Sequence, residues 1–190
     1  KGAMVASFHP LQTFPTAIPS MTRLQGIGFA VTGNSGLVNW LHEIIVSFGG
    51  IKLAISDDSR SIYHASAVMA CGYVVTALQH SLKIWERLGV SNEMALAALM
   101  PLMRTTMDNV QEYGVNAAAT GPIVRGDINT IEEHLQSLRE MDTDILEFYA
   151  FLGKHGIRCS GSVKLAGTTN QRVDDLLCSY LNRVNHSIEA

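Results

Sequence analysis

DDSRSIYHASAVMACGYVVTALQHSLKIWERL, residues 57–88, contains no proline and one internal glycine, Gly72. Between positions 65 and 78 it is apolar on nearly every helical face, and a helix that is apolar all round is normally buried all round. The acidic start favours a helix N-terminus, and Gly89 is a suitable stop. The sequence therefore predicts one long buried helix at the centre of a mainly α fold.

The composition limits the possible functions. The net charge of −3 provides no basic field for nucleic acid. Hydrophobic residues make up 47% of the chain and charged residues 16%, so some apolar surface is expected to meet a partner chain. Cys71, Cys159 and Cys178 are far apart, which argues against disulfides and zinc and favours the cytoplasm. The fully apolar part of the long helix covers about 14 residues, fewer than the roughly 20 that span a membrane.

The residues before the long helix read as strand, loop, strand, helix and strand. Strands are expected near residues 4–9, 27–32 and 51–55, and Asn34 is expected to cap an amphipathic helix ending near Phe48. Three strands with one helix leave a sheet face uncovered, so residues 1–56 are expected to be the C-terminal part of a Rossmann-like α/β domain. Residues 57–190 are expected to form an all-helical domain.

Four more helices are expected downstream, over residues 91–113, 130–141, 143–155 and 171–184. Ser91 is a suitable N-cap for the first. Thr130 and Glu133 have the spacing of a capping box for the second.

Four segments together resemble one family: HPLQTFP at 9–15, GIGFAVTG at 26–33, RSIYHASAV at 60–68 and TGPIVRGDINTIEEHL at 120–135. It is a group of Rossmann-type oxidoreductases with a helical C-terminal domain like that of 6-phosphogluconate dehydrogenase. Pyrroline-5-carboxylate reductase, ketopantoate reductase and prephenate dehydrogenase are relatives. The resemblance implies NAD(P) as cofactor, a helical domain that builds homodimers, and an active site between the two domains.

The chain departs from that family in two places. Gly26, Gly28 and Gly33 do not have the G-x-G-x-x-G spacing of a pyrophosphate-binding turn, so that turn is expected upstream of Lys1. Cys71-Gly72 stands where the family usually carries Ser-Asn, which removes a polar group expected to face the cleft.

His9 and His64 are the first candidates for chemistry. His9 ends a strand, where its imidazole could exchange a proton with a substrate oxygen, or it could simply cap the turn before Pro10. His64 shares a helical face with Arg60, four residues earlier. This pair could bind a substrate carboxylate, or His64 could be a core histidine with a satisfied hydrogen bond.

The downstream candidates are Thr105, Asn109 and Arg125. Thr105 and Asn109 lie four positions apart and could present hydrogen bonds to a cleft, or they could be polar residues of helix packing. The guanidinium of Arg125 suits a carboxylate or phosphate, but it could instead pair with Asp127, which could itself cap the helix that follows. No metal-binding spacing is present.

Two functions follow from these observations. The first is the substrate-binding and dimerisation half of an NAD(P)-dependent oxidoreductase acting on a small carbonyl or imine compound. His9, His64 and Asn109 are expected to act in catalysis, and Gln12, Arg60, Thr105 and Arg125 to bind substrate. The second is a structural or dimerisation module without a cofactor site of its own.

Overall fold

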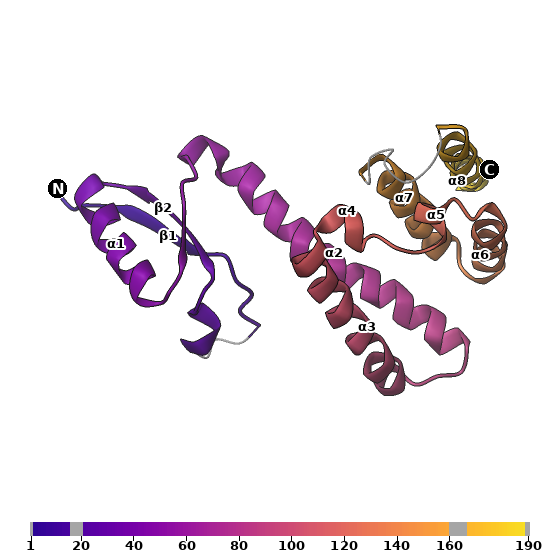
Figure 1. Ribbon diagram of the computed structural model, residues 1–190, viewed down its shortest axis with the longest axis horizontal. Coiled ribbons are helices and arrows are strands. Elements are labelled where there is room, and N and C mark those ends of the chain that lie inside the picture. The colour runs from indigo at the N-terminus through magenta and orange to yellow at the C-terminus, as the bar shows by residue number, and fades with distance from the viewer. Residues whose placement is uncertain (1, 16–20, 160–166, 189–190) are drawn as a thin grey trace. The chain divides into compact units, whose positions relative to one another are not determined.

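The computed structural model describes residues 2–15, 21–159 and 167–188, and it is mainly helical with a small three-stranded sheet near the N-terminus (Figure 1). This confirms the predicted fold class. The chain divides into two compact units, Lys1–Gln79 and His80–Ala190. The domain boundary expected after residue 56, between the α/β part and the helical domain, stays a prediction.

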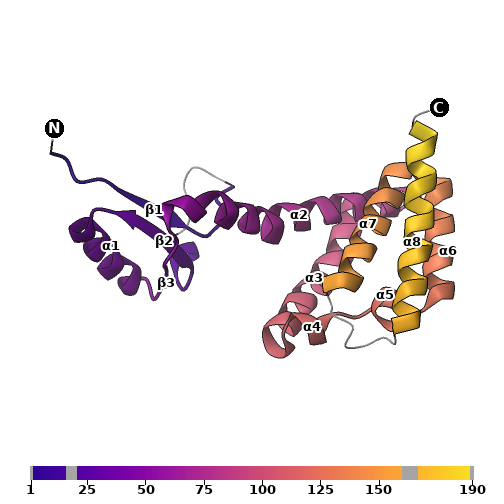
Figure 2. The ribbon, with the colours of Figure 1, turned by 90° about the horizontal axis from the view of Figure 1, so that it is seen from above.

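The first unit is built on a mixed sheet with the order β1-β2-β3. β1 (Ala6–Pro10) pairs antiparallel with β2 (Gly28–Gly33), which pairs parallel with β3 (Ile51–Leu53). The crossover between the parallel strands is α1 (Ser35–Ser47), which lies along the sheet in Figures 1 and 2. Two short 3-10 turns, η1 (Met21–Leu24) and η2 (Asp57–Ser59), complete the connections.

Side chains of β2 alternate between two faces, as the pleat of a strand requires. Phe29 and Val31 are buried together with Ile45 of α1, and they form the core of this unit. Ala30 and Thr32 belong to the opposite face, where they line a pocket. The helix therefore covers one face of the sheet and leaves the other available for a site.

Two close backbone approaches fix this packing. A Cβ atom on Gly50 would lie 2.8 Å from a ring carbon of Phe29 and 2.9 Å from Cγ2 of Ile45. Gly33 has φ of +138°, and a Cβ atom there would collide with the backbone oxygen of Val5. Both glycines are therefore required by local geometry rather than by flexibility.

The long helix α2 (Arg60–Arg87) forms as expected, but the prediction that it is buried all round is wrong. None of its residues is buried, and Ile62, Met69 and Tyr73 are 75%, 62% and 59% exposed. The buried core downstream is instead formed by apolar residues between positions 131 and 180. Within the described residues, Asp57–Arg87 is also the one helix long and apolar enough to cross a membrane, judged by length and composition alone.

The second unit has its core in its last three long helices, α6 (Ile128–Met141), α7 (Thr143–Cys159) and α8 (Gly167–Ile188), which run side by side in Figure 2. Ile84 of α2 packs against this core. Its buried residues are Ile131, Leu135, Leu138, Ile145, Leu146, Ala150, Val173, Leu177 and Tyr180. The expectation that the downstream helices wrap on the long helix is therefore wrong.

The preceding elements of this unit are α3 (Asn92–Tyr113), α4 (Val115–Ala118) and α5 (Pro122–Arg125). The side chain of Ser91 accepts a hydrogen bond from the Met94 amide, which confirms the predicted N-cap of α3. The expected capping box at Thr130 is wrong, because α6 begins earlier. Its N-cap is Asp127, which accepts hydrogen bonds from both the amide and the hydroxyl of Thr130.

Candidate functional site

The site begins with β1, whose register places His9 opposite Ala30 of the central strand. Because side chains alternate along a strand, Ser7 and His9 share one face with Ala30 and Thr32. The amide of Leu11 donates to the carbonyl of Gly28 at 2.8 Å, so the chain stays attached to the sheet just beyond the strand. His9 is thereby held at the carboxyl end of β1.

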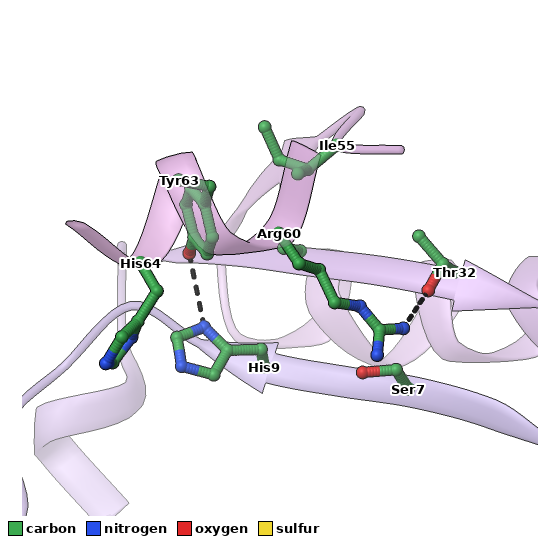
Figure 3. Close-up of a pocket in the computed structure, with 8 residues that line it drawn as sticks. Ser7, His9, Thr32, Ile55, Arg60, Tyr63 and His64 are labelled. Atoms are coloured by element: carbon green, nitrogen blue, oxygen red, sulfur yellow. Dashed lines mark hydrogen bonds between the residues drawn. The ribbon is translucent and has the colours of Figure 1, made fainter. Parts of the chain in front are cut away.

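The first turn of α2 supplies the opposite wall (Figure 3). Arg60, Tyr63 and His64 are three and four positions apart, which places them on one side of the helix. Together with the strand residues they enclose a pocket of about 260 Å³. All of its lining residues belong to the first compact unit.

Three of the side chains that line this pocket are rings that contact one another. Nδ1 of His9 lies 3.2 Å from the hydroxyl oxygen of Tyr63, and the two rings meet edge to face with centroids 5.5 Å apart. The rings of His9 and His64 also meet edge to face, at 6.3 Å. Partial burial raises the pKa of the Tyr63 hydroxyl above its ordinary value, so this group stays protonated at neutral pH.

Arg60 is held by a second set of contacts (Figure 3). Its Nη2 atom hydrogen-bonds to the hydroxyl of Thr32 and lies 2.8 Å from a carboxylate oxygen of Asp57. Thr32 in turn donates to Asp57 at 2.7 Å. The side chains of Asp57 and Arg60 are 70% and 51% exposed, so solvent weakens the ion pair and it contributes little to stability. Its effect is to fix the direction of the guanidinium group.

The structure brings together four of the seven predicted site residues. His9, His64 and Arg60 line the pocket just described, and Gln12 lines a neighbouring pocket that also contains His9 and His64. The expectation of a buried His64 is wrong, because its side chain is exposed. Its surroundings are open since α2 is not covered by other helices at this point.

The other three predicted residues belong to the second unit. Thr105 and Asn109 lie on α3, where Thr105 is exposed and Asn109 is half-buried. Arg125 ends α5 and is exposed. The charge of Arg125 helps to lower the pKa of Asp127, after the larger effect of the two hydrogen bonds from Thr130. Their roles toward a substrate stay predictions.

Tyr63 and Thr32 are site residues that the sequence reasoning missed. Tyr63 lies three positions after Arg60, so helical spacing alone could have added it to the same wall. Thr32 could be placed in the pocket only from the register between β1 and β2, which the sequence alone does not reveal. Among residues 2–15, 21–159 and 167–188, no cluster of His, Cys, Asp and Glu side chains has the geometry to hold a metal ion.

The chain belongs to a family defined as a domain of unknown function, DUF2520, whose model matches residues 27–155. Two solved structures share its fold. Protein TM1727 from Thermotoga maritima is 20% identical, with a TM-score of 0.61 over 97% of this chain and 63% of that one. The putative NADP oxidoreductase BF3122 from Bacteroides fragilis is 22% identical, with a TM-score of 0.66 over 80% of this chain and 57% of that one.

The chain thus spans less than two thirds of the length of either structure. No curated protein matches it. At these identities the similarity concerns the fold, and the chemistry has to be argued from the residues of the site.

Proposed function

We propose that this chain is the substrate-binding part of an NAD(P)-dependent oxidoreductase acting on a small carbonyl or imine compound. The observation that carries the proposal is the convergence of His9, Tyr63, His64 and Arg60 on one pocket. A similar fold in a protein named as an NADP oxidoreductase supports the proposal, as does the resemblance of the sequence motifs.

In this proposal, His9 donates the proton to the substrate oxygen. In its imidazolium form, His9 donates one N–H from Nδ1 to the oxygen of Tyr63 and has its Nε2–H available for a substrate oxygen. The Tyr63 contact fixes the ring, so the proton is presented in one direction. His64, with its ring 6.3 Å from that of His9, is the second group able to exchange a proton there.

Arg60 serves as the anion-binding group of the pocket. Both of its contacts described above use Nη2, and in the described part of the chain Nε and Nη1 make no further hydrogen bond. These N–H groups lie on different edges of the planar guanidinium, so each can donate a single hydrogen bond to an anionic group, which the positive charge of Arg60 also attracts.

Among residues 2–15, 21–159 and 167–188, no turn with the G-x-G-x-x-G spacing of a dinucleotide site joins a strand to a helix. Gly28 begins β2 and Gly33 ends it, so neither belongs to a G-x-G-x-x-G turn between a strand and a helix. In the complete protein NAD(P) would therefore be held by other residues, and when bound it would supply the hydride. The chain described here would supply the proton and the substrate contacts.

The test is a titration of the complete protein with NADPH, followed by nicotinamide fluorescence. Binding is expected, and its absence would refute the proposal. With an active substrate class, His9→Ala and His64→Ala should each lower kcat by about 100-fold, as loss of a general acid does. His155→Ala, which removes an exposed histidine of the second unit, is the matched control and should leave kcat unchanged.

We also propose that the chain forms a homodimer. A homodimer is expected as well under the alternative function, in which the chain is a dimerisation module. Ile62, Met69 and Tyr73 recur at helical spacing and form an exposed apolar stripe on α2, hereafter the α2 stripe. A second copy of the chain is the proposed occupant.

A further inference from the structure

A second pocket adjoins the proposed site and shares His9 and His64 with it. Its volume is about 340 Å³, and the two pockets together fall in the usual range for small-ligand sites, roughly 300–1,000 Å³. Residues 11–13 form one wall, and the face of α2 that carries His64, Ala67 and Cys71 forms the other. The two histidines therefore lie between two compartments.

The second pocket has an apolar character. Leu11, Ala67, Val68 and Ala70 line it, and no Asp, Glu, Lys or Arg does so among the described residues. A ligand part that fills this space gains free energy by leaving water, without needing a charged partner.

Two polar side chains of the second pocket, those of Gln12 and Ser66, are already engaged with the backbone. The amide group of Gln12 donates from Nε2 to the carbonyl of Arg23 and accepts through Oε1 from the Thr13 amide. The hydroxyl of Ser66 donates to the carbonyl of Tyr63 at 2.7 Å. The predicted substrate-binding residue Gln12 thus holds the loop in place, and the pocket presents its apolar groups to a ligand.

The first pocket differs in its polar groups, because it contains the guanidinium of Arg60 and the hydroxyl groups of Ser7 and Thr32 beside a lining that is likewise mostly apolar. An anionic group fits this compartment, and an apolar chain fits the other. A molecule that occupies both must pass the rings of His9 and His64.

We infer that the substrate is a 2-oxo acid with an apolar side chain. Its carboxylate binds Arg60, its carbonyl lies at His9 and His64, and its side chain fills the second pocket toward Cys71. The inference rests on the proposed function for the chemistry at the carbonyl. Its binding geometry is testable without turnover, since Cys71 is an exposed free thiol in the wall of the apolar compartment.

The experiment measures alkylation of Cys71 by iodoacetamide in the complete protein, with peptide mapping by mass spectrometry. The probes are 2-oxohexanoate, pyruvate and hexanal. At about ten times its Kd, 2-oxohexanoate should slow the labelling of Cys71 by about tenfold, because free protein falls in that proportion. Pyruvate lacks the chain that reaches Cys71, and hexanal lacks the carboxylate, so neither should protect at the same concentration. Cys178 is the internal control, and its labelling should not change.

Two variants separate the compartments. Arg60→Gln should weaken protection by 2-oxohexanoate about 10- to 100-fold, the usual effect of losing a hydrogen bond to a charged group. Lys52→Gln removes an exposed cation of β3 that does not line either pocket, and it should leave protection unchanged. Val68→Phe fills the apolar compartment, so it should abolish binding of 2-oxohexanoate while pyruvate binding, followed by saturation-transfer NMR, persists.

The outcomes distinguish this inference from the proposed function. Protection of Cys71 without NADPH binding would support the two-compartment site and refute the oxidoreductase. NADPH binding without protection by 2-oxohexanoate would leave the oxidoreductase standing and overturn the inference. Equal protection by pyruvate, or full protection in the Arg60→Gln variant, would also overturn it.

Discussion

Nδ1 of His9 and the hydroxyl oxygen of Tyr63 lie 3.2 Å apart, although 54 positions separate the two residues in the sequence. The contact joins the end of β1 to the first turn of α2. The hydroxyl of Tyr63 on α2 therefore orients the imidazole of His9 on β1, and both residues line the same pocket.

The contact predicts that Tyr63 is a positioning residue for His9. Tyr63→Phe keeps the ring and removes the hydroxyl, so kcat of the complete protein should fall about 2- to 10-fold, the worth of one ordinary hydrogen bond, while KM stays constant. At a pH where the His9 ring is neutral, its ¹⁵N NMR pattern should change from one tautomer to a mixture. Tyr73→Phe, which removes an exposed hydroxyl from the same helix, should change neither quantity. An unaltered His9 spectrum in the Tyr63 variant would contradict the assignment.

Two glycines of α7 predict opposite effects of the same substitution. A Cβ atom on Gly153 would lie 2.7 Å from Cδ1 of Ile123 and 3.3 Å from Cδ1 of Leu177, so Gly153→Ala overpacks the core and should destabilise the protein by about 1–3 kcal/mol. A Cβ atom on Gly156 meets nothing within 4 Å. Gly156→Ala should therefore stabilise by up to about 1 kcal/mol through helix propensity. Urea denaturation measures both, and equal effects would show that this part of the core is packed differently.

The proposed homodimer predicts that a charge on the α2 stripe disrupts association. Met69→Glu places a carboxylate among exposed apolar residues that the second copy would cover, and an unpaired charge in an interface is costly. Sedimentation velocity should show a dimer for the natural chain and a monomer for the variant. Met94→Glu changes a methionine of similar exposure on α3, outside the stripe, and serves as control. A natural chain that is monomeric at all concentrations would refute the proposed dimer.

Asp127 predicts an acid-sensitive contribution to stability. The Thr130 hydroxyl, the Thr130 amide and the charges of Arg125 and His134 lower the pKa of this carboxyl below its ordinary value of 3.8, against a smaller opposing effect of burial. Because the folded-state pKa is the lower one, the contribution is fully present above the ordinary pKa and is lost as the pH falls through the folded-state pKa.

Asp127→Asn keeps an N-cap acceptor but cannot titrate. The stability difference between the natural chain and this variant should be constant near neutral pH and shrink as the pH falls below about 4, the ordinary range of an aspartate. Thermal unfolding followed by circular dichroism over this range measures it. Thr130→Val should reduce the same pH dependence by removing the largest cause of the shift.

Local sequence signals predicted most of the elements. The periodic apolar positions and the Asn34 cap located α1, and the Asn34 side chain does accept from the Gly36 amide. The start of α6 was misplaced because two side chains three positions apart, Asp127 and Thr130, could both cap it. Only the hydrogen bonds in the folded chain decide between such neighbours.

The exposure of α2 could not be predicted from the sequence for a different reason. An apolar run shows that a surface favours a dry environment, but it does not identify what covers that surface. Likewise, motifs and helical spacing identify His9, Arg60 and His64 as candidate site residues. They do not identify Thr32, because its proximity to Arg60 depends on long-range strand pairing that local patterns do not encode.

Thr32, Asp57 and Arg60 contact one another, so Thr32 on β2 helps to set the direction of the Arg60 guanidinium on α2. A change from threonine to valine at position 32 would remove one anchor of the guanidinium while leaving its charge in place. Under the proposed function, homologues could therefore come to bind acids of different shape without replacing the arginine itself. In such homologues, substrate selectivity would change through residues that orient Arg60, such as Thr32, rather than through Arg60 itself.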